Sequence, residues 1–367
     1  MSSYWNDRVQ KLDPYVPGEQ PRDGQFVKLN TNENPYPPSP KVIEAIRNVL
    51  SDGPAMGDRL RLYPDPGCRE LREAVAARYG VKPDQVFAGN GSDEVLAFVF
   101  GAFFNSNIAL PILFPDITYS FYPVYAGLWN IPFRTIPLTE DFSINSDDYF
   151  VPSGGVIFPN PNAPTGRTLP LRDILAVAGY QKKQNRVVVV DEAYTAFSGS
   201  AGDVSAVPHI KEYPNLLTVH TFSKMGSLAG LRAGFAIGSE ELIEGLCRVR
   251  DSFNSYPLDR LAQAGAAAAI RDTAYYDGVT QKVIATRERT AAALIALGFR
   301  VIPSGANFLF VSSPKKPGPE LFAALRERGI LVRHFNKPRI VDFLRVSIGT
   351  DEDMDAFLKA CGEIVFD

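Results

Sequence analysis

The chain has 367 residues and a formal net charge of −3, with 45% hydrophobic and 22% charged residues. This composition is typical of a soluble globular protein, and the small negative charge gives no electrostatic case for binding nucleic acid or an anionic membrane. The length predicts two domains or one large α/β body.

The three cysteines, Cys68, Cys247 and Cys361, lie far apart in the sequence. Their spacing matches neither a zinc site nor a disulfide framework, so we expect no metal. A reducing cytoplasm is the simplest setting for them. The N-terminus has no apolar signal core, and the apolar run Val95–Phe104 is too short to cross a bilayer. We therefore expect a cytoplasmic protein that does not enter a membrane.

Three proline-rich loops interrupt the N-terminal part, and by composition alone each is an ordinary connector. They are Asp13–Gly18, Leu29–Pro38 and Arg61–Gly67. Between them we expect a helix over Ser39–Leu50, with Ser39 as its N-cap and Pro40 at its first position. A second helix is expected over Arg69–Tyr79.

The stretch Val86–Val95 predicts a strand, a glycine turn and a helix start with Ser92 as N-cap. Backbone N–H groups at a helix N-terminus bind phosphate. A dinucleotide fingerprint would need glycine where Glu94 stands, so the stretch fits one phosphate better than a pyrophosphate. As an isolated motif, however, a plain helix start is the simpler interpretation.

A buried strand ending in a carboxylate is predicted at Val187–Asp191, because four β-branched residues precede the acid. Ligands of open α/β sheets bind at such strand ends. The rival interpretation is the magnesium-binding acid of an ATPase, but the sequence contains no phosphate loop of the form G-x-x-x-x-G-K-[ST]. Two further strands are expected at Ile108–Phe114 and at the start of Gly155–Gly166.

The stretch Leu216–Arg232 begins as an apolar strand and then places Lys224 among hydroxyl residues and glycines. Alone, such a lysine is usually a satisfied residue at a strand-to-loop junction. A lysine at the end of a core strand loses hydration, which lowers its pKa and allows its amine to form a Schiff base with a carbonyl. Thr221, Ser223 and Arg232 add donors suited to a phosphate. Together they predict a phosphorylated aldehyde cofactor, pyridoxal phosphate.

The remainder of the chain alternates between predicted strands and helices. The strands are Gly234–Gly238, Phe299–Ile302, Asn307–Val311, Ile330–Arg333 and Phe343–Gly349, and the helices are Ser239–Asp251, Leu261–Ile270, a long one after Tyr276, and Glu320–Arg328. Arg345 falls inside an alternating strand pattern, where a buried guanidinium needs an anionic partner.

The run Thr221–Lys224 followed by Leu228–Arg232 resembles the signature of fold type I pyridoxal-phosphate enzymes, most closely the histidinol-phosphate aminotransferase family. The resemblance covers nearly the whole chain. It implies an α/β fold: a large domain with a mostly parallel, seven-stranded type of sheet, as in aspartate aminotransferase, plus a small α+β domain from both termini. We expect an N-terminal arm and part of the small domain over 1–50, the cofactor domain over 51–253 and the small C-terminal domain over 254–367.

The resemblance also implies roles at the cofactor. Lys224 would hold it covalently and move the proton, Asp191 would keep the ring nitrogen protonated, Tyr194 would donate to the ring oxygen, and Tyr119 would stack on the ring. The phosphate would be anchored by Gly91, Ser92, Asp93, Thr221, Ser223 and Arg232.

One position departs from the family pattern. The family has asparagine directly before Pro-Thr-Gly, where it bonds the ring oxygen, but this chain has Ala163. We expect Asn162 to substitute. By the same resemblance, Tyr63 reaches the cofactor phosphate of the other subunit, so a homodimer with shared active sites is expected.

The implied substrate residues are Tyr15, Asn32, Arg333 and Arg345. Tyr15 and Arg333 would contact a substrate phosphate, and Arg345 a carboxylate or phosphate. The implied reaction of histidine biosynthesis converts histidinol phosphate and 2-oxoglutarate to imidazole acetol phosphate and glutamate. Alternatives are an aromatic amino-acid aminotransferase or a phosphoamino-acid decarboxylase of the same fold. An alternative of another class is a nucleotide-binding ATPase or a non-catalytic binding module.

Overall fold

A central sheet of seven strands, in the order β2-β8-β7-β6-β5-β3-β4, organises the larger part of the protein. The structure is a computed structural model that describes residues 4–21, 26–104, 110–199 and 204–366. The strands are β2 (Val86–Gly89), β3 (Ile112–Pro115), β4 (Phe133–Ile136), β5 (Val156–Pro159), β6 (Val188–Asp191), β7 (Leu216–Thr221) and β8 (Gly234–Ile237). Only β8 runs antiparallel to its neighbours, so the carboxyl ends of β5, β6 and β7 meet at one edge.

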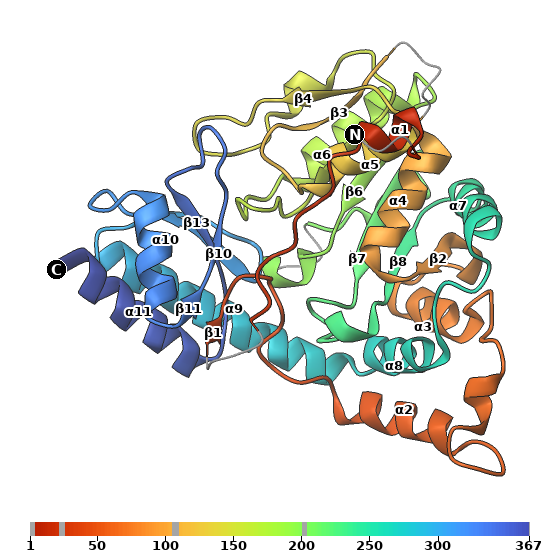
Figure 1. The fold of residues 1–367 in the computed structure, drawn as a ribbon. Helices are drawn as coiled ribbons and strands as arrows, with labels where there is room; N and C mark the ends of the chain where they lie inside the picture. The colour runs from red at the N-terminus through yellow and green to blue at the C-terminus, as the bar shows by residue number, and fades with distance from the viewer. Residues whose placement is uncertain (1–3, 22–25, 105–109, 200–203, 367) are drawn as a thin grey trace.

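Helices cover both faces of this sheet (Figure 1). On one face, Phe87 packs with α4 (Gly91–Phe103), α5 (Phe121–Trp129) and α7 (Glu240–Phe253). On the other, Val86 and Ala88 pack with α2 (Pro40–Ser51), α3 (Arg69–Tyr79) and α8 (Arg260–Arg271), while α6 (Leu171–Lys182) covers β5 and β6. Because alternate strand residues point to opposite faces, both sides of each strand are apolar.

A smaller antiparallel sheet has the order β12-β13-β10-β9. It consists of β9 (Arg300–Ile302), β10 (Phe308–Ser312), β12 (Arg333–His334) and β13 (Phe343–Ser347), and it packs with α9 (Thr273–Ala296), α10 (Gly318–Glu327) and α11 (Asp351–Phe366). Near the N-terminus, β1 (Val27–Lys28) pairs in parallel with β11 (Ile330–Leu331). Figure 1 shows α9 leading from α8 toward this smaller sheet.

Short helical turns complete the chain: α1 (Asp7–Gln10), η1 (Asp58–Arg61), η2 (Pro83–Gln85), η3 (Ser146–Tyr149), η4 (Thr195–Ser198), η6 (Val207–His209) and η7 (Ala229–Leu231). Within the described ranges, no helix has the length and apolar character needed to cross a bilayer. Nor does any group of three or more His, Cys, Asp or Glu side chains there have an arrangement suited to a metal ion.

The predicted fold class is confirmed, and most predicted elements lie within a few residues of their observed bounds. The strand expected over Ile108–Phe114 begins at Ile112, although 105–109 lie outside the described residues. The helices α5, α6 and α11 were not anticipated. α5 is almost uniformly apolar and lies against the sheet on one side, so it lacks the polar stripe that reveals an amphipathic helix.

Candidate active site

A pocket of about 230 Å³ lies at the carboxyl ends of β5, β6 and β7, between the large sheet and the smaller one. Most side chains selected from the sequence line it: Tyr15, Asn32, Ser92, Asp93, Tyr119, Asp191, Tyr194, Thr221, Ser223, Lys224, Arg232, Arg333 and Arg345. They come from segments far apart in the chain. The tertiary structure therefore brings together one lysine, two carboxylates and three guanidinium groups.

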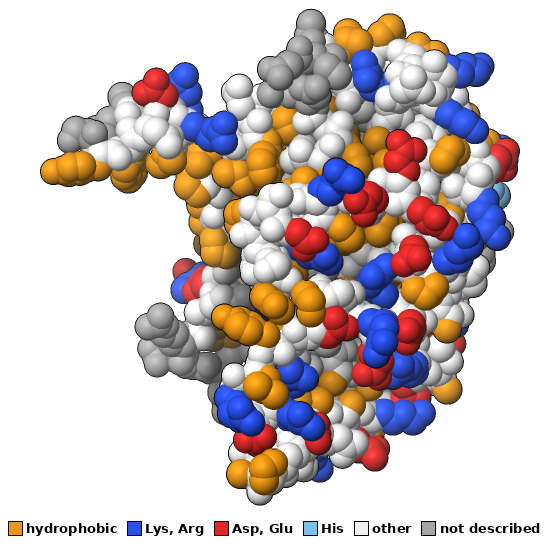
Figure 2. All heavy atoms as spheres, turned by 90° about the vertical axis from the view of Figure 1, so that its right-hand side faces the viewer, with side chains coloured by type: hydrophobic (Ala, Val, Ile, Leu, Met, Phe, Trp, Pro, Cys, Tyr) orange, Lys and Arg blue, Asp and Glu red, His pale blue; other side chains and the backbone are white. Residues whose placement is uncertain are grey.

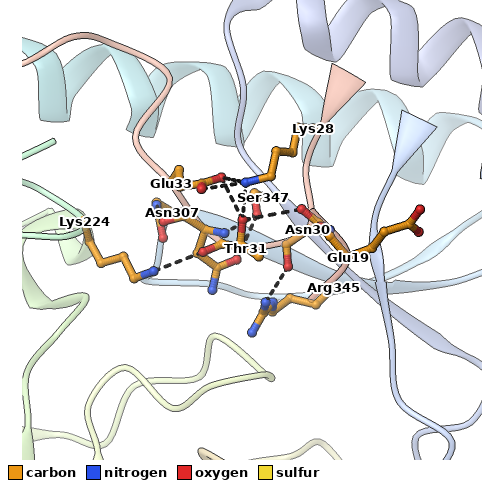
Figure 3. A network of polar contacts seen from close by, with 10 residues as sticks. Glu19, Lys28, Asn30, Thr31, Glu33, Lys224, Asn307, Arg345 and Ser347 are labelled. Carbon is orange, nitrogen blue, oxygen red and sulfur yellow. Dashed lines mark hydrogen bonds and ion pairs between the residues drawn. The ribbon is translucent and has the colours of Figure 1, made fainter. Parts of the chain in front are cut away.

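Lys224 follows β7, and its Nζ donates to the carbonyl oxygen of Thr31 over 3.1 Å (Figure 3). Asn34 Nδ2 donates to the carbonyl of Lys224 itself, also over 3.1 Å. Burial, together with the nearby Arg345, lowers the pKa of the Lys224 amine to about 8, while Glu33 opposes the shift. At neutral pH a larger fraction of this amine is therefore neutral than in a free lysine.

Asp191 ends β6 and is almost fully buried. Its Oδ2 accepts from the Tyr122 hydroxyl at 3.2 Å, and its Oδ1 accepts from the Ala193 N–H at 3.2 Å. Burial raises the pKa of Asp191 to about 6, although both hydrogen bonds oppose that rise. The group is consequently ionised for the most part at neutral pH, inside a poorly solvated site.

One corner of the pocket is shaped to take a phosphate. Gly91, at φ +81°, begins α4, and a Cβ at Gly234 would lie 2.5 Å from the Gly91 carbonyl carbon and the Ser92 nitrogen. Only glycine allows β8 to approach the start of α4 so closely. Arg232 Nη2 meets Asp93 Oδ2 at 2.9 Å, and its Nη1 donates to Ser223 Oγ at 3.4 Å. The helix N–H groups, hydroxyls and guanidinium are the kinds of donor that can hold an anion.

Two carboxylates, those of Asp93 and Glu94, lie at the start of α4, and each has hydrogen-bond partners. Asp93 Oδ1 accepts from the Tyr119 hydroxyl at 2.6 Å, so Asp93 connects Tyr119 with Arg232. Glu94 Oε2 turns back and accepts from the Asn90 N–H at 2.6 Å. Glu94 therefore does not line the pocket, whereas Asp93 does.

Two arginines from the smaller sheet face the pocket. Arg333 and Arg345 are directly paired across β12 and β13. Arg345 Nη2 donates to the Asn30 carbonyl at 2.9 Å, and Arg333 Nη2 donates to the Val16 carbonyl at 3.1 Å. Among the described residues neither arginine has an ion pair, and the buried Nε of Arg345 has no hydrogen-bond partner. Two uncompensated guanidinium groups thus favour an anionic ligand.

The asparagine-rich loop is held by several partners. Asn32, at φ +56°, donates from Nδ2 to the Tyr194 hydroxyl at 3.1 Å. Its Oδ1 accepts from Ser347 Oγ at 2.9 Å, and its carbonyl accepts from Asn307 Nδ2 at 3.0 Å. The Asn32 side chain is therefore fixed beside Tyr194. Asn307 and Ser347 were missed by the sequence analysis, because neither lies near a recognisable motif.

Asn162 does not line the pocket. Its Nδ2 donates to the Ile117 carbonyl at 2.9 Å and to Thr165 Oγ1 at 3.1 Å, while its Oδ1 accepts from Thr118 Oγ1 at 3.3 Å. The amide stabilises its own loop, and the neighbouring Ala163 lies against the pocket instead. The expected substitution of Asn162 for the missing ring-oxygen contact therefore has no support in this geometry.

Tyr63 also lies apart from the pocket of its own chain. Its side chain is 77% exposed, and its ring stacks on Tyr256 with centroids 4.5 Å apart. Both rings line a separate surface hollow. This position leaves the Tyr63 hydroxyl free to contact another molecule.

A larger cavity of about 660 Å³ lies elsewhere and includes Glu192 and His220. Burial raises the pKa of Glu192 to about 7 and lowers the pKa of His220 to about 3. Glu192 already accepts from Ser205 Oγ and the Ala206 N–H, each at 2.7 Å. Since Glu192 has protein partners and His220 pairs with the Thr218 hydroxyl, this cavity is a weaker candidate for chemistry than the smaller pocket.

The smaller pocket fits pyridoxal phosphate in its donor set: an amine for the aldehyde, a carboxylate for the ring nitrogen, a tyrosine for the ring face and an anion site for the phosphate. These are the groups that such a cofactor requires at its reactive, electronic and anchoring positions.

Comparisons with known proteins agree with this geometry. The family model for aminotransferase class I and II matches residues 24–360. The histidinol-phosphate aminotransferase of Aromatoleum aromaticum is 55% identical over 370 residues, covering 100% of both chains. Histidinol-phosphate aminotransferase 1 of Burkholderia pseudomallei is 54% identical over 365 residues, covering 100% of this chain and 99% of the relative.

Solved structures show the same fold. A histidinol-phosphate aminotransferase from Sinorhizobium meliloti in complex with pyridoxal-5'-phosphate matches with a TM-score of 0.85 and 23% identity, covering 100% of this chain and 98% of that one. A mutant of Thermus thermophilus aspartate aminotransferase matches with a TM-score of 0.84 and 22% identity, covering 99% and 100% respectively.

Proposed function

Because the chain belongs to the class I and II aminotransferase family, whose members depend on pyridoxal phosphate, we propose that it transfers the amino group of histidinol phosphate to 2-oxoglutarate. The products are imidazole acetol phosphate and glutamate. The observation that carries this assignment is the pair Arg333 and Arg345, which faces the same pocket as Lys224 and has no carboxylate partner within the described part of the chain. Membership of the family removes the ATPase and the non-catalytic binding module as alternatives.

When bound, pyridoxal phosphate supplies a ring that withdraws electrons from the substrate carbon. Lys224 is the residue that would hold its aldehyde and then accept and return the substrate's proton as general base and acid. Its lowered pKa supports this role, since a general base needs a neutral amine near the working pH. Thr31 orients the amine through its carbonyl oxygen.

Asp191 would keep the ring nitrogen protonated by placing a negative charge beside it. The acid ends a rigid strand and accepts two hydrogen bonds, so its orientation is supported from both sides. Tyr194 would donate to the ring oxygen. Burial raises the pKa of Tyr194, so its hydroxyl remains a donor at neutral pH, and Asn32 positions that hydroxyl.

The cofactor phosphate would bind at the start of α4, with Ser92, Thr221, Ser223 and Arg232 as donors. Tyr119 would stack on the ring. Here Asp93 has a supporting task, because it orients both Tyr119 and Arg232. We do not assign the ring-oxygen contact to Asn162, whose amide is engaged within its own loop.

The substrate phosphate would lie between Tyr15, Arg333 and Arg345. A phosphate monoester carries up to two negative charges and accepts bidentate hydrogen bonds, which suits two adjacent guanidinium groups. In the second half of the reaction, the carboxylates of 2-oxoglutarate would use the same cations. Histidinol phosphate and 2-oxoglutarate would occupy the pocket in turn, so one anion site could serve both substrates.

The test is a substrate panel with 2-oxoglutarate as acceptor. We expect kcat/KM for histidinol phosphate to exceed that for histidinol, phenylalanine or tyrosine at least about 100-fold, since a phosphate can engage both guanidinium groups, whereas histidinol offers no anion and an amino acid only one carboxylate. Faster turnover of phenylalanine or tyrosine would instead support the aromatic aminotransferase. Release of carbon dioxide from a phosphoamino acid would support the decarboxylase.

We further propose that the enzyme is a homodimer with shared active sites. The exposed ring of Tyr63 supports this, as do the exposed apolar side chains of Leu60, Leu62 and Tyr256 near it. Figure 2 shows other exposed apolar side chains along one edge of the molecule. In such a dimer, Tyr63 would donate to the cofactor phosphate of the partner subunit.

Two coarser assignments complete the proposal. We propose a large domain centred on 51–253 and a small domain formed by both chain ends, supported by the pairing of β1 with β11. The packing of α8 with α2 and α3 associates 260–271 with the larger sheet. We also propose that the enzyme works in the cytoplasm, consistent with three free cysteines.

A further inference from the structure

We propose that Tyr122 is a positioning residue for the cofactor ring, acting through its hydrogen bond to Asp191 and its contact with Tyr119. The inference rests on the proposed cofactor site but not on the identity of the amino donor. No sequence motif marks Tyr122.

Tyr122 lies in the first turn of α5 and is fully buried. Its hydroxyl donates to Asp191 Oδ2 at 3.2 Å, which is the only side-chain hydrogen bond to Asp191 among the described residues. Its ring meets the edge of Tyr119 at a centroid distance of 5.8 Å and an interplanar angle of 85°. One side chain thus contacts both the group expected at the ring nitrogen and the group expected on the ring face.

The rest of the Tyr122 ring is held by the core. It lies 5.8 Å from Phe114 of β3 and 6.3 Å from Phe100 of α4. A phenol clamped by aromatic neighbours loses little further rotamer freedom when it donates a hydrogen bond. The hydroxyl is therefore preorganised toward the Asp191 carboxylate.

The charge environment defines what this bond does. The titratable groups that interact electrostatically with Asp191 are Asp93, Tyr122, Tyr125, Glu192, Tyr194 and Lys224. Burial raises the pKa of Tyr122, so it stays a donor at all working pH values. Its hydrogen bond lowers the pKa of Asp191 against the effect of burial. Without it, Asp191 becomes protonated at higher pH and loses the charge that holds the ring proton.

The alternative is that Tyr122 only fills space. Tyr125 provides the matched control, because it lies one turn further along α5, is also buried, and belongs to the same apolar cluster. Its hydroxyl is buried with no hydrogen-bond partner among the described residues. Y122F and Y125F therefore remove the same atom from the same core, and only Y122F removes a bond to Asp191.

The experiment compares the affinity of pyridoxal phosphate for the wild-type, Y122F and Y125F apoproteins between pH 5 and pH 9, by the visible absorbance of the bound cofactor. For Y122F we expect the low-pH decline in affinity to move up by about one pH unit, so that affinity falls about tenfold at pH 5 and only about twofold at pH 7. Y125F should stay within about twofold of wild type. In a D191N background, Y122F should have no further effect.

Three results would overturn the inference: an unshifted pH profile in Y122F, an equal shift in Y125F, or a Y122F effect that persists in D191N. Thermal unfolding of the apoproteins is measured alongside, and a Y122F chain that fails to fold while Y125F folds would reduce Tyr122 to a packing residue. Because the readout is cofactor affinity, an inactive wild type toward histidinol phosphate would contradict the proposed function without affecting this test.

Discussion

The amine of Lys224 donates to the carbonyl oxygen of Thr31, a residue 193 positions earlier in the chain, over 3.1 Å. Figure 3 shows Lys224 and Arg345 both directed at the Asn30–Thr31 segment, which connects the N-terminal strand β1 to the active site. The next residue, Asn32, accepts hydrogen bonds from Asn307, which precedes β10, and from Ser347 of β13. One loop therefore sets the position of the reactive amine relative to the substrate-binding arginine.

Replacing Lys224 by alanine should abolish transamination, because no other lysine among the residues that the structure describes lines the pocket. Cofactor can still bind without a covalent bond, through the phosphate site. The measurement is borohydride reduction followed by peptide mapping, in which wild type should carry the pyridoxyl group on Lys224. The control is Lys182→Ala, whose amine donates to the exposed Glu212 carbonyl and lies over the Tyr213 ring outside the pocket, and which should retain full activity. A labelled peptide elsewhere would contradict the assignment.

Asp191→Asn should lower turnover by several orders of magnitude yet stabilise the apoprotein. The folded-state pKa of about 6 lies above the unfolded value of about 3.9, so burying the carboxylate costs stability at neutral pH. The gain in the free energy of unfolding should be on the order of 2 kcal/mol above pH 7 and should fade as pH falls from about 6 to 4, where the native carboxyl is already protonated.

Urea unfolding at pH 8 and pH 4.5 checks this sign. A D191N apoprotein that is less stable than wild type at pH 8 would show that the hydrogen bonds of the carboxylate stabilise the fold by more than its burial costs. A loss of turnover below about tenfold would contradict its electronic role.

Arg345→Lys should reduce kcat/KM for histidinol phosphate by about 100-fold, because lysine keeps the charge but cannot make the planar fork. Cofactor affinity should change little, since Arg345 lies on the substrate side. Arg248→Lys is the control, as Arg248 forms only an exposed pair with Glu244. If R345K loses cofactor and substrate affinity equally, Arg345 supports the whole pocket and does not select the substrate.

Tyr63→Phe tests the shared site by complementation. Mixing inactive K224A with Y63F should produce hybrid dimers in which one site has both Lys224 and the partner's tyrosine intact. We expect the mixture to exceed the summed activities of its components after subunit exchange. If Tyr63 served its own chain, the hybrid would contain no intact site and no recovery would occur.

Gly234→Ala should weaken pyridoxal phosphate binding by about tenfold or more, because the new Cβ would lie 2.5 Å from the backbone of Gly91 and Ser92 and displace the start of α4. Gly230→Ala is the matched control, since a Cβ there meets nothing within 4 Å. Equal cofactor affinities of the two variants would show that the α4 N-terminus tolerates displacement.

The sequence alone was sufficient to predict those features that depend on residues close together in the chain. The apolar run before Asp191, the apolar run before Lys224, and Ser39 with Pro40 at the start of α2 all follow from neighbours along the chain. The site residues on these stretches could be named because β6 and β7 end at the same edge of the sheet. The family resemblance supplied Tyr15 and Arg333, which composition alone would leave as surface residues, whereas the alternating strand pattern already marked Arg345.

Tertiary structure decided what depends on contacts between distant segments. Whether Asn162 or Ala163 faces the pocket is settled by the Ile117 carbonyl and Thr165, which bind the Asn162 amide. The hydrogen bond from Tyr122 to Asp191 joins residues 69 positions apart, and the sequence around neither residue predicts it. Sequence patterns report the periodicity and chemistry of neighbours, whereas hydrogen bonds and burial depend on which segments the folded chain brings together.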